Sequence, residues 1–115
     1  MVPPTDNGSS KRYAAGDMVF EQGDEADGVY IVQEGEIELL LDNVLVGLEQ
    51  AGGIIGEMAM IDDGSRSATV VARNNCRLLP VDRHRFNFMI QQTPNFAQNV
   101  MRVIANRLRR TDVVL

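Results

Sequence analysis

The sequence is poor in the residue types from which metal and disulfide sites are built. Its 115 residues include one cysteine (Cys76), one histidine (His84) and no tryptophan. A single cysteine excludes an internal disulfide framework and a zinc site made of several cysteines. Such a cysteine is more often a small core residue than a nucleophile when no histidine partner is evident. We therefore expect Cys76 to be buried, and we expect neither a metal site nor a catalytic residue.

Long apolar runs and a basic amino terminus are also lacking. The stretch Ile37–Leu41 is interrupted by Glu38 and is far too short to span a bilayer. The first ten residues read MVPPTDNGSS, without the basic start and apolar stretch of a secretory signal. We expect residues 1–10 to form a flexible tail, and the chain to work in a reducing cytoplasm without a membrane span.

The charge is divided unevenly along the chain. Residues 1–65 carry 14 acidic and 2 basic side chains, a net charge of −12. Residues 66–115 carry 2 acidic and 9 basic side chains, a net charge of +7. The whole chain has a net charge of −5 and lacks the basic surface that a general nucleic-acid binder needs. We therefore expect no direct nucleic-acid binding. The arginine-rich second half leaves room for one localised anion site.

Short apolar stretches separated by glycines fill the first half of the chain and return after residue 66. Several of them alternate apolar with polar residues, as half-buried strands do. Ile37, Leu39 and Leu41, for example, fall on one face of their stretch. The expected strands are Met18–Phe20, Val29–Val32, Ile37–Leu41, Val44–Leu48, Ser67–Ala72 and Arg77–Val81. Closely spaced strands of this kind predict an antiparallel β-roll, a double-sheet or jelly-roll arrangement.

Helical signals occupy three places. Residues 56–61 are good helix formers for one or two turns. Asp82 is suited to N-cap a helix at Arg83–Gln92, and Thr93 with Pro94 to start another. In that last segment apolar residues recur at helical spacing, at Phe96, Val100, Val103, Ile104 and Leu108. We therefore predict one mainly β domain, residues 11–115, with a short helix inside the roll and two C-terminal helices.

The segment from Gly52 to Val71 contains the residues with a specific chemical use. Gly56 allows close approach of the backbone, and a short helix beginning there would present N–H groups to an anion. Arg66, past the following turn, could grip two phosphate oxygens in a bidentate fork. Glu57 beside an anion site would suit a ribose hydroxyl, which a carboxylate accepts well. Together these residues suit the phosphate ester of a sugar.

Each of these residues also has an ordinary structural explanation. Arg66 could be a surface residue paired with Asp62 or Asp63, a contact that contributes about 0–1 kcal/mol. Glu57 could be an acid favoured at a helix start, contributing roughly 0.3–1 kcal/mol. The combination of residues favours the binding interpretation over the separate ones.

The sequence resembles the cyclic-nucleotide-binding domain, a module shared by catabolite-activator-type regulators, protein-kinase regulatory subunits and cyclic-nucleotide-gated channels. The resemblance extends over roughly Tyr13 to Arg110 and includes the series YAAGDMVFEQGDEADGVYIVQEGEIELLL. Its most specific part, GEMAMIDDGSRSATV, is similar to the family's phosphate-binding cassette, with nine positions from Glu57 to Arg66.

The resemblance implies a ligand site within that cassette. Arg66 would pair with the exocyclic oxygens of a cyclic phosphate, and Glu57 would accept from the ribose 2′-OH. Backbone N–H groups around Glu57 would complete the anion cradle. The residues of the implied site are Gly56, Glu57, Met58, Ala59, Arg66 and Ser67. Because a hydroxyl at Ser67 can contact the phosphate or a guanine edge, the base choice stays open between cyclic AMP, which we favour, and cyclic GMP.

The final helix is the expected moving part. In the family it swings over the base when ligand binds, and Arg107 is a candidate lid residue that would stack on or hydrogen-bond the purine. Arg107 could equally be a solvated cation of the last helical turns, where cations suit the dipole. The apolar stripe beginning at Phe96 could be core packing or the seam of a homodimer. The resemblance thus implies a regulatory module, not an enzyme, that signals to an unidentified downstream protein.

The chain departs from the family pattern at several places. Ser65 stands where the family often has proline, and Ile55 where it often has phenylalanine. The ten-residue tail does not supply the helical segment that usually precedes the first strand, and no DNA-reading helix pair follows Arg110. Two alternatives remain: a module of the same fold that has lost its ligand and serves protein interaction, and a cupin-type metal enzyme, against which the single histidine argues.

Overall fold

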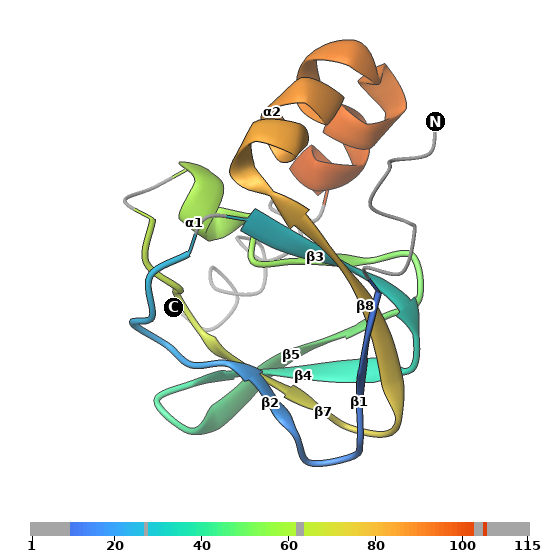
Figure 1. The fold of residues 1–115 in the computed structure, drawn as a ribbon. Helices are drawn as coiled ribbons and strands as arrows, with labels where there is room; N and C mark the ends of the chain where they lie inside the picture. The colour runs from blue at the N-terminus through green and yellow to red at the C-terminus, as the bar shows by residue number, and fades with distance from the viewer. Residues whose placement is uncertain (1–9, 27, 62–63, 103–104, 106–115) are drawn as a thin grey trace.

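The computed structural model describes residues 10–26, 28–61, 64–102 and 105. Within these residues the chain forms a roll of short strands, with one short helix beside it and a helical part at one end (Figure 1). The strands are β1 (Lys11–Tyr13), β2 (Met18–Phe20), β3 (Gly28–Glu34), β4 (Glu36–Leu41), β5 (Val44–Gln50), β6 (Ile54–Ile55), β7 (Thr69–Ala72) and β8 (Cys76–Asp82). The helices are α1 (Met58–Ile61) and α2 (Arg83–Gln92), and residues 94–102 are helical as well.

The strands build two antiparallel sheets that enclose the main core. One sheet has the order β1-β8-β3-β6 and the other the order β2-β7-β4-β5. Because successive side chains of a strand point to opposite faces, alternate residues of each strand enter the space between the sheets. The inner cluster consists of Val32, Ile37, Leu39, Ile55, Val70, Ala72, Cys76 and Leu78. The β-roll and the burial of Cys76 expected from the sequence are thereby confirmed.

The helical part covers the outer face of the β1-β8-β3-β6 sheet. The remaining alternate side chains of three strands form a second cluster there with the helices. This outer cluster consists of Val29, Ile54, Leu79, Val81, Phe86 and Val100. Burial on both faces explains why Val29–Val32 and Leu78–Val81 are almost continuously apolar.

The two later helical segments start where the sequence predicts them, whereas α1 begins at Met58 and not at Gly56, whose positive φ is not helical. The Asp82 carboxylate accepts from the backbone N–H of Arg85 at 2.7 Å, as an N-cap does, and α2 has the predicted bounds. The carbonyl of Thr93 accepts from the N–H groups of Phe96 and Ala97 at 3.0 and 3.2 Å. The chain therefore starts a second helical segment at Pro94, as expected.

Two strands were not predicted. β1 forms a strand because it pairs with β8, for example at Tyr13 opposite Cys76. β6 forms a strand because Ile54 and Ile55 pair with β3. β6 has only two residues, and β1 begins with two charged side chains, so neither shows the apolar pattern of a strand. Leu41, which alternation places on the face of Ile37 and Leu39, is 42% exposed at the end of β4, where the chain turns into β5.

Some predictions fall on residues outside the described part of the chain. They include the expected tail, apart from Ser10, whose hydroxyl donates to Oε1 of Gln33 at 2.8 Å. They also include Val103, Ile104 and Leu108 of the apolar stripe. None of the helices among the described residues has the length and apolar character that crossing a membrane requires.

Candidate functional site

Gly56 turns the chain from β6 into α1. Ile54 and Ile55 pair with β3, so the start of the turn is anchored to a sheet. Gly56 has a φ of +91°, a conformation that side-chain-bearing residues rarely adopt. The N–H of Met60 then donates to the carbonyl of Glu57 at 3.0 Å and closes the first turn of α1. The glycine singled out in the sequence is thus required by the backbone path.

Backbone hydrogen bonds hold Arg66 against the loop that precedes β3. Its N–H donates to the carbonyl of Asp24, and its carbonyl accepts from the N–H of Gly23, both at 2.8 Å. Ser65, just before it, forms an isolated β-bridge with Glu25. This pairing directs the Arg66 side chain into the protein, where the residue is 7% exposed. The interpretation of Arg66 as a surface residue is therefore wrong.

The guanidinium of Arg66 contacts two carbonyls and an aromatic ring. Nη1 donates to the carbonyl of Gly28 at 2.9 Å and to that of Gly56 at 3.3 Å. The central guanidinium carbon lies 4.0 Å from the centroid of the Phe20 ring. A cation is costly to bury unless it is satisfied in this way. Arg66 is thus a fixed positive charge beside the start of α1.

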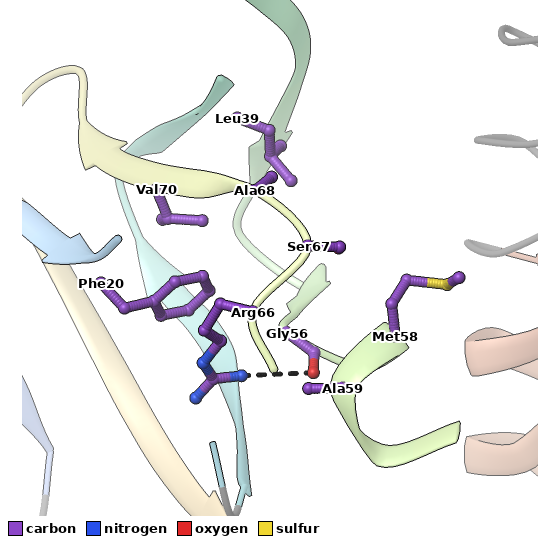
Figure 2. Close-up of a pocket in the computed structure, with 9 residues that line it drawn as sticks. All are labelled: Phe20, Leu39, Gly56, Met58, Ala59, Arg66, Ser67, Ala68 and Val70. Atoms are coloured by element: carbon purple, nitrogen blue, oxygen red, sulfur yellow. Dashed lines mark hydrogen bonds between the residues drawn. The ribbon is translucent and has the colours of Figure 1, made fainter. Parts of the chain in front are cut away.

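A hollow lies between Arg66 and α1 (Figure 2). The space in it, counted together with solvent at its open mouth, is about 260 Å³. Five of the predicted site residues line it: Gly56, Met58, Ala59, Arg66 and Ser67. Four others that the sequence analysis missed complete the lining: Phe20, Leu39, Ala68 and Val70. The structure therefore brings most of the predicted site together around one cavity.

The apolar wall of the hollow comes from the β2-β7-β4-β5 sheet. Phe20, Leu39 and Val70 lie on three neighbouring strands of it, at β2, β4 and β7. Alternation in the sequence could identify Leu39 as inward-facing, but only the strand order brings these three residues beside Arg66. The wall combines apolar surface with one fixed cation, the composition typical of small-molecule sites.

Glu57 is placed differently from its neighbours. The residue is 0% exposed and does not line the hollow, although it directly precedes α1. Glu57 thus lies at a helix start, as its ordinary structural explanation expects, but it is fully buried there. Burial of a carboxylate is unfavourable for stability unless the surrounding protein satisfies it. Its role toward a ribose hydroxyl stays a prediction.

Arg83, the first residue of α2, connects this helix with α1. Its Nη1 lies 3.4 Å from the carbonyl oxygen of Met60, near the end of α1. Its Nη2 lies 3.5 Å from the carbonyl oxygen of Ala26. A cation suits the carbonyl end of a helix, and the long distances make this a weak contact that can be broken. The sequence analysis did not single out Arg83, because nothing in the sequence shows that it reaches α1.

Two further expectations concern Arg107 and metal binding. Arg107, the candidate lid residue, lies outside the described residues. Among the residues that are described, no group of three or more His, Cys, Asp and Glu side chains is arranged to hold a metal ion.

The comparison with known families agrees with the fold. Residues 10–93 match the family described as the cyclic nucleotide-binding domain. The chain belongs to this family.

Named relatives share most of this chain but are longer than it. The cyclic AMP receptor protein of Thermus thermophilus is 32% identical over 108 residues, which are 90% of this chain and 50% of that protein. The regulatory subunit of cAMP-dependent protein kinase from Yarrowia lipolytica is 40% identical over 76 residues, which are 66% of this chain and 20% of that protein. The chain thus spans half of one relative and a fifth of the other.

Solved structures include one relative with each cyclic nucleotide. The EAL enzyme Bd1971 is 31% identical to this chain in both its cAMP-bound and its cGMP-bound form, with TM-scores of 0.67 and 0.68. The superposition covers 90% and 91% of this chain and 29% of that enzyme. The domain therefore also occurs as part of a longer enzyme.

Proposed function

We propose that this chain binds a cyclic nucleotide in the hollow beside α1, with cyclic AMP preferred to cyclic GMP. The observation that carries the proposal is the buried Arg66, whose guanidinium forms one wall of the hollow next to Gly56. A cyclic phosphate is a single anion, and one fixed guanidinium matches it in charge and shape. Occupation of the site would then reposition the C-terminal helices.

The open mouth of the hollow favours a ligand that is only partly enclosed. The hollow is small and open to solvent, and its lining combines the Arg66 cation with apolar side chains. It is therefore suited to the ribose-phosphate, with the base extending through the open mouth toward the exposed Ser67. The apolar wall of Phe20, Leu39 and Val70 would keep water from the ionic contact, which strengthens it.

A phosphate would compete with a carbonyl that Arg66 already contacts. The bond from Nη1 to Gly56 is 3.3 Å long, whereas the bond to Gly28 is 2.9 Å. Replacement of a long bond to a neutral acceptor by a charge-assisted bond to phosphate is favourable. We infer that Arg66 exchanges the carbonyl of Gly56 for the ligand and keeps that of Gly28.

The proposed preference for cyclic AMP draws on the names of relatives. The Thermus protein and the Yarrowia kinase subunit are both named for cyclic AMP. The enzyme solved with both nucleotides shows that the domain in that protein accepts either base. Selection between the bases would therefore depend on the rim of the hollow, where Ser67 lies.

The proposed helix movement depends on the contact between α1 and α2. Ligand atoms next to Met58 and Ala59 would press on α1, and Arg83 links the end of α1 to the start of α2. A weak contact of this kind can transmit or release a movement at little free-energy cost. A homodimer through the stripe that begins at Phe96 and a downstream protein partner stay predictions.

Calorimetric titration with cyclic AMP and cyclic GMP tests the binding proposal. Arg66→Lys keeps the charge but loses the planar fork, and should weaken binding roughly tenfold to a hundredfold, as loss of a charge-assisted hydrogen bond does. Arg73→Lys is the matched control, because Arg73 is exposed and lies outside the hollow. If the wild-type chain binds neither nucleotide at millimolar ligand, the alternative of a degenerate interaction module replaces the proposal.

The helix movement needs a separate measurement. A pair of spin labels, one at Asn87 on α2 and one at Asp42 in the β4–β5 turn, reports the position of α2 on the roll. Saturating cyclic AMP should shift this distance in the wild type. Arg83→Met should reduce the shift while leaving the nucleotide affinity within about threefold, a surface-scale effect. An unchanged distance in the ligand-saturated wild type would contradict the proposed movement.

A further inference from the structure

The guanidinium of Arg66 lies against an aromatic ring that no sequence motif connects with it. Its central carbon is 4.0 Å from the centroid of Phe20 on β2, and Figure 2 shows the two side chains next to each other at the hollow. We propose that Phe20 is a positioning residue, whose ring holds the Arg66 guanidinium flat so that its N–H groups face the phosphate. This inference rests on the proposed function of the hollow.

A bulge in β2 turns Phe20 toward Arg66. Met18 pairs with Val71 of β7, but Phe20 pairs with Val70, so the register shifts between them. In a regular strand Met18 and Phe20 would share a face, since side chains alternate with period two. Met18 is instead 54% exposed, whereas Phe20 packs against the inner cluster. Bulges are known to re-aim side chains in this manner, particularly beside functional sites.

Phe20 is itself packed against one tyrosine, Tyr30, and a second tyrosine lies beside that one. Its ring centroid lies 5.9 Å from that of Tyr30 on β3, with an angle of 31° between the ring planes. Tyr30 also lies 5.8 Å from the guanidinium carbon of Arg66. Burial, together with the neighbouring Tyr30, raises the pKa of Tyr13 on β1 to about 12. The ring below Arg66 thus belongs to an aromatic group with members from both sheets.

The two sides of the guanidinium are held by different forces. On one side the ring of Phe20 offers its negative face to the cation. At the edge, Nη1 donates to the carbonyls of Gly28 and Gly56. When a phosphate displaces the carbonyl of Gly56, the ring and the carbonyl of Gly28 would still fix the plane. A side chain without a ring, such as leucine, fills similar space but has no flat face against which the guanidinium plane can be held.

Affinity measurements on three variants test this role. Phe20→Leu should weaken cyclic AMP binding about tenfold, the size of a desolvated cation–π contact. Phe20→Tyr restores the ring and should restore affinity to within about threefold. Val19→Ala is the control, because Val19 packs against the same cluster without touching the hollow. It should lower stability but leave the affinity unchanged.

A double-mutant cycle separates positioning from general packing. If Phe20 acts through the planar guanidinium, Phe20→Leu should weaken binding far less in an Arg66→Lys background than in the wild type. In the ligand-free protein, the ring should also shift the Arg66 Nε–H resonance upfield, and this shift should vanish in Phe20→Leu and persist in Phe20→Tyr.

The outcomes distinguish this inference from the proposed function. If the wild type binds neither nucleotide, the proposed function fails and the inference fails with it. If the wild type binds and Phe20→Leu binds equally well, only the inference is overturned. Equal losses from Phe20→Leu in both backgrounds would also overturn it, since they would assign Phe20 a purely structural role.

Discussion

The strongest test of the site geometry is a pair of substitutions at glycines with nearly the same φ. Gly56 has φ +91° and Gly52 has φ +92°. A Cβ at Gly56 would meet Nη1 of Arg66, whereas a Cβ at Gly52 would meet nothing within 4 Å. Gly56→Ala and Gly52→Ala therefore share the conformational strain and differ in whether Arg66 must move.

The two variants should separate stability from binding. A left-handed conformation is unfavourable for alanine by about 1–2 kcal/mol, so urea unfolding should show at least this loss in both. Only Gly56→Ala pushes Arg66 away from the hollow. Loss of a charge-assisted hydrogen bond contributes about 1.5–3 kcal/mol. The cyclic AMP affinity of Gly56→Ala should therefore fall roughly tenfold to a hundredfold, while that of Gly52→Ala stays at the wild-type value.

Calorimetry on both purified variants decides the matter. Unchanged affinity in Gly56→Ala would refute the reasoning, because Arg66 would then bind phosphate from a displaced position. An equal loss of affinity in Gly52→Ala would also refute it, since that loss would come from strain rather than from contact with Arg66. Arg66 resonances of the two variants in the ligand-free state would show directly which substitution moves the guanidinium.

Three further predictions concern other parts of the chain. Glu57→Gln should reduce the preference for cyclic AMP over its 2′-deoxy analogue, because a neutral amide oxygen accepts a hydroxyl proton roughly half as strongly as a carboxylate does; equal ratios in wild type and variant, measured by calorimetry, would contradict the ribose role. Asp82→Ala removes the N-cap of α2 and should lower the free energy of unfolding by about 1 kcal/mol in urea; no change would mean that the cap adds nothing. Because burial raises the pKa of Tyr13 from 10.0 to about 12, the unfolded chain loses the phenol proton first. The stability due to neutral Tyr13 is complete below pH 10 and is lost as the pH rises through about 12, so unfolding measurements should show a smaller alkaline loss in Tyr13→Phe; equal losses would refute it.

Local patterns in the sequence were sufficient for most elements. Alternation identified the longer strands, and a polar cap before an apolar run identified α2 with its bounds. These signals depend on neighbours within a few residues, so they survive without knowledge of the fold. β1 and β6 escaped prediction because each is a strand only through pairing with a distant partner.

In the candidate site, too, local sequence patterns identified some features, whereas others depend on distant parts of the chain. The spacing from Glu57 to Arg66, together with Gly56, marked the segment that lines the hollow with Met58, Ala59 and Ser67. The burial of Glu57 and Arg66 was not predicted, because burial depends on which strands and loops lie over a residue. A charged residue in a turn is ordinarily expected in solvent.

The sequence by itself determined the class of fold, the family cassette and the residue types available to bind a phosphate. Only the tertiary structure decided what surrounds Arg66. The carbonyl of Gly28 and the ring of Phe20 are 38 and 46 positions away in sequence, and they reach the guanidinium through the strand order and a bulge in β2. Periodicity is a property of one segment, whereas the contacts that fix a buried charge come from several segments packed together, which is why the fold alone sets them.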